Sequence, residues 1–142
     1  MIAGIIRQAK ELGACDKIHN CRDWKDLRTL LFSPQGREFC RKQNYPYRET
    51  WQSIKSIIGE SIEEVKIDCG TIRIDRQCRV AVIGATQADV YCAGCSENYL
   101  VIVQHGAAVT IHAEKFSVVR IECLSDDCRI NIVSDDTAIV IR

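Results

Sequence analysis

The chain has few of the residue pairs that close tight antiparallel hairpins. Between Val101 and Arg142 the sequence contains no Asn-Gly, Asp-Gly or Gly-Gly pair, and these are the pairs that favour two-residue β-hairpins. The same segment nevertheless alternates apolar and polar residues almost throughout. This absence argues against a series of tight hairpins and raises the question of which fold repeats strands without them.

Net charge and long apolar runs are also missing. Lys and Arg together number 19, as do Asp and Glu, so the chain lacks the excess positive charge typical of proteins that bind nucleic acid or anionic membranes. No apolar run approaches the roughly 20 residues that a membrane helix needs, and charged residues interrupt the start, "MIAGIIRQAKELG", which therefore does not resemble a signal peptide. We expect a protein of the bacterial cytoplasm with reduced thiols, binding neither nucleic acid nor membrane.

The segment Met1–Ile58 shows the spacing of short amphipathic helices. Apolar residues recur with helical spacing, first at i, i+3, i+4 and i+7 from Ile2, and three or four short helices are expected. Ser33 and Pro34 are suited to the N-cap and first position of a helix, Asp23 to an N-cap, and Gly13 and Gly59 to helix ends. The expected apolar faces are Ile2, Ile5, Ile6, Ala9 and Leu12; Trp24, Leu27, Leu30 and Leu31; and Trp51, Ile54 and either Ile57 or Ile58.

From Val65 onward the apolar period changes to two, which is typical of strands. The expected inward pairs are Val65/Ile67, Ile72/Ile74, Val80/Val82, Val90/Cys92, Leu100/Ile102, Val109/Ile111, Val119/Ile121, Ile130/Ile132 and Ile139/Ile141. Taken two at a time, these pairs repeat after about 20 residues, which suits one coil of a parallel β-helix. We therefore predict an α+β fold in which short N-terminal helices cap a β-solenoid. The alternative is an antiparallel β-sandwich or meander.

This interpretation divides the chain into a helical head, 1–62, and a β-repeat domain, 63–142. The helices are expected to cover the first coil, while Val101, Val103, Val118 and Val140 lie on the outer face as possible seats for helices or another chain. The sequence stops at Arg142 without a capping segment after the last strand. An uncovered coil exposes unpaired backbone, so we expect it to dock on a protein partner or on another copy of itself.

Cysteine is abundant, with nine residues. The spacing of Cys92 and Cys95 in "CAGC" matches half of a zinc site, and Cys123 with Cys128 is a loosely spaced candidate for the other half. Cys92 also continues the inward alternation after Val90, where cysteine packs as a small apolar residue. We expect core packing, hence no metal and no cofactor, with these four cysteines as weak metal candidates. Cys40 beside Phe39 is likewise expected in a core and not as a nucleophile.

The histidines and the acidic bends suggest further chemistry that we judge weaker than a structural role. His105 and His112 lack an evident third metal ligand, and His19 lies between Cys15 and Cys21 in a loop that resembles a ligand cluster in residue type alone. Two "SDD" bends, at 125–127 and 134–136, carry Asp side chains that favour turns. Calcium binding, or a glycosidase carboxylate pair, is the alternative. No catalytic residue is assigned.

Three blocks of sequence carry a resemblance. The combination of "AKELGACDK", "LLFSPQGREFCRKQNYP" and "VAVIGATQADVYC…YLVIVQHGAAVTIHAEKFSVVRIE" resembles a group of small Bacteroidetes proteins, many of them encoded within prophages and other mobile elements. The resemblance covers nearly the whole chain, although the abundance of cysteine is not part of it. The group brings no reaction and no catalytic residues. What it implies is a phage accessory or virion-associated role.

These observations favour a non-enzymatic structural or interaction protein of a Bacteroidetes phage or prophage, placed in the cytoplasm or incorporated in a virion. Its expected partners are phage proteins or further copies of itself. One alternative is a β-helix module that binds or processes a glycan. A second alternative is a small metal-binding protein that uses the cysteines named above.

Overall fold

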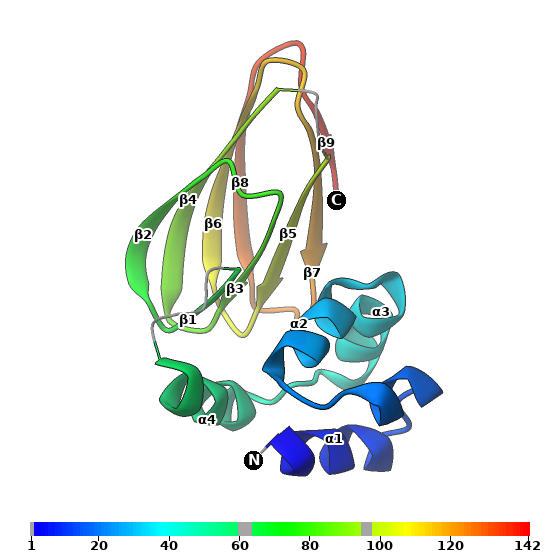
Figure 1. The fold of residues 1–142 in the computed structure, drawn as a ribbon. Helices are drawn as coiled ribbons and strands as arrows, with labels where there is room; N and C mark the ends of the chain where they lie inside the picture. Colours follow the sequence, from blue (N-terminus) through cyan, green and yellow to red (C-terminus); the bar gives the residue numbers. More distant parts are fainter. Residues whose placement is uncertain (1, 60–63, 95–97) are drawn as a thin grey trace. The chain divides into compact units, whose positions relative to one another are not determined.

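The computed structural model describes residues 2–59, 64–94 and 98–142. Four α-helices and a short 3-10 helix come first, and nine strands in two sheets follow. The chain is therefore α+β (Figure 1). It forms two compact units, Met1–Thr50 and Trp51–Arg142. The helical segment expected to end at residue 62 thus contributes its last helix, from Trp51 on, to the unit that contains the strands.

The first unit contains α1 (Ile2–Glu11), η1 (Asp16–Asn20), α2 (Trp24–Phe32) and α3 (Pro34–Gln43). The expected caps are confirmed. The Asp23 side chain accepts a hydrogen bond from the Asp26 amide at 3.0 Å, and Ser33 Oγ accepts one from the Gly36 amide at 3.0 Å, with Pro34 in the first turn of α3. These side chains satisfy amides that a helix leaves unpaired at its start.

Packing within this unit depends on a glycine and a tyrosine. A Cβ atom on Gly36 would lie 1.8 Å from the carbonyl oxygen of Leu30, so α2 and α3 approach too closely for any other residue. Tyr45 is buried, and its hydroxyl donates a hydrogen bond to the Ile5 carbonyl at 3.1 Å. Burial raises the pKa of Tyr45 to about 12, which keeps the hydroxyl protonated and able to donate. Cys40 is buried as expected, and desolvation raises its pKa to about 12.

The second unit holds the strands, and every strand pair in the described residues is parallel. The antiparallel sandwich is therefore wrong. The five-stranded sheet has the order β1-β3-β5-β7-β9 and the four-stranded sheet the order β2-β4-β6-β8. The bounds are β1 Val65–Ile67, β2 Gly70–Asp75, β3 Arg79–Ile83, β4 Thr86–Ala93, β5 Asn98–Gln104, β6 Ala108–Glu114, β7 Val118–Cys123, β8 Arg129–Ser134 and β9 Ile139–Ile141.

Successive strands alternate between the two sheets, so that each strand pairs with the next but one (Figure 1). Ala88 pairs with Val109 and Val109 with Ile130, so equivalent positions of the four-stranded sheet recur at a constant spacing along the chain. The first repeat is shorter, since Val65 already pairs with Ala81. The spacing of the later repeats corresponds to the expected period of about 20 residues per coil.

One apolar core runs between the two sheets. Its fully buried members include Val80, Val82, Val90, Cys92, Val109, Ile111, Val119 and Ile121. The predicted inward pairs of β3, β4, β6 and β7 are thus confirmed. Ile74 of β2 is also a member, and Ile72, Ile130 and Ile132 pack against the cluster while partly exposed.

The predicted inward faces of β1, β5 and β9 are wrong. In β5 the core contains Tyr99, Val101 and Val103, not Leu100 and Ile102, and in β9 it is Val140 that packs on the core. In β1, Val65 pairs with Ala81 and Ile67 with Ile83, so both leave the sheet on the face opposite to Val80 and Val82. The cause is the register, because side chains alternate between the two faces of a strand. A repeat with an odd number of residues moves the inward positions from even to odd numbers, whereas an even repeat keeps them.

The bends are held by side chains that reach from one repeat to the previous one. Thr86 Oγ1 accepts a hydrogen bond from the Cys69 amide at 2.9 Å, and Ser125 Oγ accepts one from the His105 amide at 2.8 Å. Left-handed backbone at Asp68, His105 and Gly106 turns the chain at these points. Polar bends of this kind replace hairpins, which explains why the sequence lacks the usual hairpin pairs.

Helix α4 (Arg48–Ile58) buries Trp51 and Ile54 of its expected apolar face, with Ile58 half-buried and Ile57 exposed. Trp51 Nε1 donates a hydrogen bond to Gln104 Oε1 at 3.0 Å, and Lys55 Nζ donates one to the Asp68 carbonyl at 2.9 Å. Gln104 follows Ile102 by two residues, so Trp51 lies on the outer face of the five-stranded sheet. The helix therefore lies beside the strands. The sequence instead predicts helices that cover the end of the first coil.

The outer face near α4 is apolar. Two rows of paired residues there are fully or almost fully buried: Val65, Ala81 and Ile102, and Ile67, Ile83 and Gln104. Further along the same face β7 presents Arg120 and Glu122, whose side chains lie 3.8 Å apart. The seat for a helix is thus formed by the residues that the sequence predicts as inward. Val101, Val103 and Val140, predicted as outward, belong to the core side; Val118 alone of that set lies outward.

Candidate interaction surface at the end of the two sheets

Strands β8 and β9 are edge strands, one in each sheet, at the same end of the strand stack. We name this region the β8–β9 end. Between the edges the core is incompletely covered: the partly buried residues that pack on it here are Cys128, Ile130, Ile132, Ala138 and Val140. An edge strand presents a row of backbone donors and acceptors to a further strand, so this end offers both hydrogen bonds and apolar surface.

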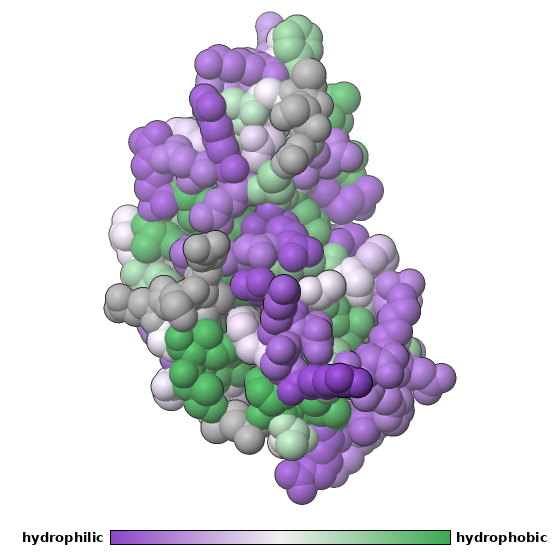
Figure 2. Space-filling model, viewed as in Figure 1, coloured by the Kyte–Doolittle hydropathy of each residue, from purple (hydrophilic) through white to green (hydrophobic). Residues whose placement is uncertain are grey.

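Exposed apolar side chains surround the β8–β9 end. Ile139 is 58% exposed, Ile141 38% and Val133 52%. Val118 pairs with Ile139 in register, so these two and Ile141 share the outer face of the five-stranded sheet. Figure 2 shows hydrophobic surface at the upper right, where Figure 1 draws β9. Clustered exposed apolar residues of this kind are typical of protein interaction sites.

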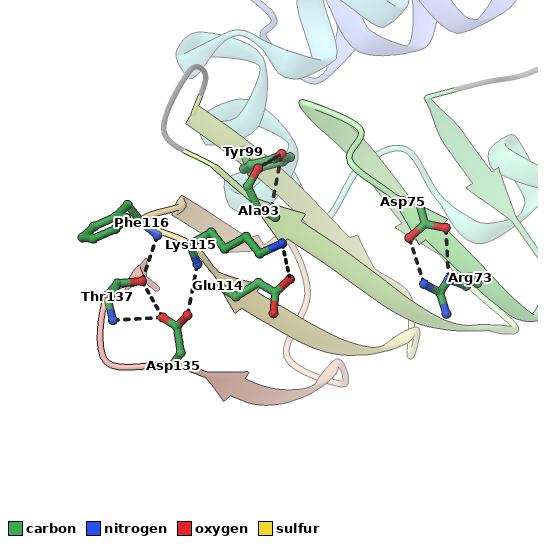
Figure 3. Close-up of polar contacts among 9 residues, drawn as sticks. All are labelled: Arg73, Asp75, Ala93, Tyr99, Glu114, Lys115, Phe116, Asp135 and Thr137. Carbon is green, nitrogen blue, oxygen red and sulfur yellow. Dashed lines mark hydrogen bonds and ion pairs between the residues drawn. The ribbon is translucent and has the colours of Figure 1, made fainter.

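The bend before β7 adds an exposed aromatic ring. Phe116 is 65% exposed, and both it and Lys115 have left-handed backbone, with φ of 62° and 54°. The bend between β8 and β9 holds this conformation. The Lys115 amide donates a hydrogen bond to Asp135 Oδ2 at 3.0 Å, and the Phe116 amide donates one to Thr137 Oγ1 at 2.8 Å (Figure 3). Bulky residues rarely adopt such φ values, so the ring is fixed outward at a cost in backbone energy.

The acidic bends act as turn formers, as the sequence predicts. Asp135 also accepts hydrogen bonds from the Thr137 hydroxyl and from the Thr137 and Ala138 amides. These hydrogen bonds lower the pKa of Asp135 to about 2, and the bond from the Thr137 hydroxyl contributes most. In the other bend, a hydrogen bond from Ser125 at 2.6 Å lowers the pKa of Asp127. One carboxylate of each bend, Asp127 or Asp135, is thus bonded to the protein itself.

The two acidic bends lie at opposite ends of β8. At a rise of about 3.3 Å per residue, its six residues separate them by about 20 Å. Glycosidase carboxyl pairs lie roughly 5 to 9.5 Å apart. The glycosidase pairing of these bends is therefore wrong.

The candidate cysteines that the structure describes lie in different surroundings. Cys92 faces the core and is 1% exposed, and desolvation raises its pKa to about 12; a zinc ligand would instead be a thiolate. Cys123 and Cys128 are half-buried on either side of the bend before β8, and Cys128 Sγ lies 3.3 Å from Ser125 Oγ. Cys95 lies outside the described residues. The eight cysteines of the described part are reduced thiols.

The histidines are also placed apart. His19 is in η1, 4.0 Å from an Asp16 oxygen, and His105 is in the bend before β6. His112 lies on the outer face of the four-stranded sheet. In the described parts of the chain, no group of three or more His, Cys, Asp and Glu side chains is arranged to hold a metal ion.

His112 belongs to a stack that the sequence does not reveal. Its ring lies parallel to that of Tyr91 with centroids 4.3 Å apart, and the Arg73 guanidinium lies 4.0 Å from the Tyr91 centroid on the neighbouring strand. His112 Nε2 is 3.1 Å from Asp89 Oδ1, and Arg73 forms two hydrogen bonds to Asp75 (Figure 3). The register between β2 and β4 differs in length from that between β4 and β6. The contact of these three side chains depends on both registers, which cannot be read from the sequence.

A cavity of about 380 Å³ opens beside the first strands. It is lined by Lys55, Gly59, Val65, Lys66, Ile67, Asp68, Cys69, Ile72 and Arg73. Lys55 is bonded to the Asp68 carbonyl and Arg73 to Asp75, so these two cations are already engaged.

Comparisons with known proteins give no relative. No family model, no curated protein and no solved structure matches the chain. Within residues 2–59, 64–94 and 98–142, no helix is both long and apolar enough to cross a membrane.

Proposed function

We propose that the second unit is a β-solenoid with two sheets per coil. The parallel pairing, the alternation between sheets and the regular register of the four-stranded sheet support this architecture. A solenoid extends by adding coils that each contact only their neighbours, and it therefore provides a rigid body with flat faces and two ends.

We further propose that the chain is a non-enzymatic structural or interaction protein that docks on another protein through its β8–β9 end. The observation that carries this proposal is the coincidence at one end of two edge strands, an incompletely covered core and exposed Phe116, Ile139 and Ile141. Backbone pairing to an edge supplies affinity, and neighbouring apolar side chains supply specificity.

The biological setting that we propose is a Bacteroidetes phage or prophage, with the protein in the bacterial cytoplasm or in the virion. Its support is the resemblance of the three sequence blocks described above. The test is to purify particles from an induced lysogen on a density gradient and measure this chain by quantitative mass spectrometry. Constant stoichiometry with the major particle protein across the peak supports a virion component. Recovery at the top of the gradient alone contradicts it.

A glycan-binding role is the second candidate, favoured by the outer face of the four-stranded sheet. Arg73, Asp75, Asp89 and His112 there are 63%, 59%, 51% and 30% exposed in their side chains, and they stand in register on neighbouring strands. A flat set of planar polar groups can hydrogen-bond to sugar hydroxyls. Binding on a glycan array that Asp89→Ala abolishes and Glu114→Ala leaves unchanged would support this role over the first.

A further inference from the structure

We propose that the partner of the β8–β9 end is a second copy of the same chain, so that two molecules form a closed two-fold dimer. This inference rests on the proposed docking function of that end and names its occupant. It is carried by the two edges, by the charges at both ends of the stack, and by the register in which the edges would pair.

Both edges are unprotected. Natural edge strands are commonly blocked by lysine, proline or inward-pointing charges, whereas β8 has the sequence RINIVS and β9 the sequence IVI. Of these residues only Arg129 is charged, and it starts β8 on the outer, exposed face. The inward positions of these two strands are Ile130, Ile132 and Val140, so the inner faces of β8 and β9 themselves carry no charge.

The opposite end of the stack is protected. Lys66 of β1 pairs with Val82, a fully buried core residue, so the lysine leaves β1 on the side that faces the interior. Stacking the β8–β9 end of one molecule on the β1 end of another would bury this ammonium group against Ile132 and Val140, which is costly. Open-ended, head-to-tail growth is therefore disfavoured, and like ends meet.

The two-fold axis that we propose runs parallel to the strands, midway between the two sheets, and brings both edges into use at once. It exchanges the places of the two sheets, so that β9 of each molecule lies beside β8 of the other. Strands of the two sheets run in opposite directions around the coil (Figure 1), and β9 and β8 of the two molecules are therefore antiparallel. Such an interface is isologous and closes at two copies. Each sheet then continues from one molecule into the next, with no edge left at the junction.

One register of this pairing brings the central apolar positions of β8 and β9 together. When Val140 lies opposite Ile132 of the second copy, the core positions of both molecules face each other. Ile139 then lies opposite Val133 of the second copy, and these are two of the most exposed large apolar residues, at 58% and 52%. Facing apolar residues on neighbouring strands stabilise a sheet. The dimer thus explains why apolar side chains are exposed on both outer faces.

The test is sedimentation equilibrium of the full chain under reducing conditions, so that exposed Cys15, Cys69 and Cys78 form no cross-links. We expect twice the chain mass. Ile132→Lys places a charge on the core side of β8 and is expected to weaken the dimer at least about 100-fold. Asn131→Lys adds the same charge to the outer side of the same strand and is expected to change the dissociation constant less than about threefold. Far-UV circular dichroism and thermal unfolding check that both variants fold.

Hydrogen exchange of the wild-type chain keeps the proposal testable if Ile132→Lys does not fold. Amides of β8 and β9 are expected to exchange more slowly as concentration rises, while those of β4 and β6 do not change. A single-chain mass at all concentrations, growth beyond two copies, or equal dimerisation of Ile132→Lys and wild type would each refute the dimer. The chain could be monomeric in solution while its β8 and β9 amides exchange more slowly when it is bound to purified particles. That result would refute self-association and would still support the docking function.

Discussion

Phe116 has a backbone conformation that costs energy and a side chain that the proposed docking function uses. Its left-handed φ of 62° is costly for a residue with a side chain, by roughly 1–2 kcal/mol, and its exposed ring gains little from burial. The Lys115 and Phe116 amides are held in place by the hydrogen bonds that they donate to Asp135 and Thr137 in the bend between β8 and β9. The exposed ring is available to contact another molecule, as the proposed docking function requires.

The first prediction separates these two effects. Phe116→Gly removes the ring and relieves the left-handed strain, whereas Phe116→Ala removes the ring and keeps the strain. We expect the glycine variant to be more stable than the alanine variant by about 1 kcal/mol in urea unfolding. Both variants are expected to dimerise more weakly than wild type. Equal stability of the two variants would contradict the assigned backbone conformation.

The second prediction concerns Asp135 and pH. Its pKa is lowered from 3.8 to about 2 by hydrogen bonds that the folded chain donates. A carboxylate with a depressed pKa contributes stability that is complete above its ordinary pKa and is lost as pH falls through the folded value. We therefore expect wild type to exceed Asp135→Asn in stability at pH 7, and the difference to disappear between about pH 4 and pH 2.

Denaturant unfolding of both proteins at pH 7, 4 and 2.5 measures this difference directly. Asp136→Asn is the matched control, because it removes a neighbouring charge from the same bend. A difference between wild type and Asp135→Asn that stays constant over this range would show that the charge of Asp135 does not support the bend.

The third prediction concerns the nine thiols. Burial that raises the pKa of Cys92 to about 12 leaves almost no thiolate at neutral pH, and the side chain is 1% exposed. We expect iodoacetamide to modify Cys15 and Cys69 in the folded protein and Cys92 only after unfolding. Peptide mass spectrometry of quenched samples checks this order. Rapid modification of Cys92 in the folded state would place it outside the core.

At the scale of elements, α4 is connected to the strands by a buried polar pair. Trp51 Nε1 and Gln104 Oε1 are 3.0 Å apart, and both side chains are almost fully buried. A buried hydrogen bond contributes roughly 0.5–1.5 kcal/mol, and loss of one partner costs more, roughly 1–3 kcal/mol. This pair fixes the position of the helix on the outer face of the sheet.

The fourth prediction is a double-mutant cycle on this pair. Trp51→Phe removes the donor, and Gln104→Met removes the acceptor at similar volume. We expect each single change to destabilise the protein by about 1–3 kcal/mol and the double mutant to lose less than the sum, with a coupling energy of about 1 kcal/mol from urea unfolding. Additive losses would mean that the two side chains do not interact in solution.

The elements themselves were largely predictable, because caps and apolar periods are local. Ser33, Pro34 and Asp23 marked helix starts, and alternation located the strands. The face of each strand was predictable where only one face is apolar, as in β4 and β6. In β5, the run Tyr99–Val103 is apolar on both faces, so only the register decides. That register changes from an odd step between β3 and β5 to an even step between β5 and β7.

The residues that meet across repeats could not be predicted for the same reason. Arg73, Tyr91 and His112 lie on three different strands, and the contacts of Asp135 with Lys115 and of Thr137 with Phe116 span 20 and 21 residues. A sequence shows which of these residues is polar or aromatic. It does not show which positions of successive coils share a level, because a single inserted residue in a bend changes the partner.

At the scale of the whole molecule, the proposed solenoid implies that the stability of the second unit is a sum of contacts between neighbouring repeats. In such arrays the ends open more readily than the centre. Ile111 is fully buried in β6, with paired strands on both sides, whereas Ile132 in β8 is half-buried at an edge. The same substitution at these two positions should therefore destabilise different numbers of strands.

The fifth prediction compares Ile111→Ala with Ile132→Ala by hydrogen exchange at concentrations where the chain is monomeric. Ile111→Ala leaves a cavity in the centre and is expected to cost about 2–5 kcal/mol of global stability, accelerating exchange throughout β3 to β7. Ile132→Ala removes apolar surface that is already partly solvated, so acceleration is expected in β8 and β9 alone. Equal acceleration across all strands in both variants would mean that the strands unfold as one unit, and that the β8–β9 end does not open separately.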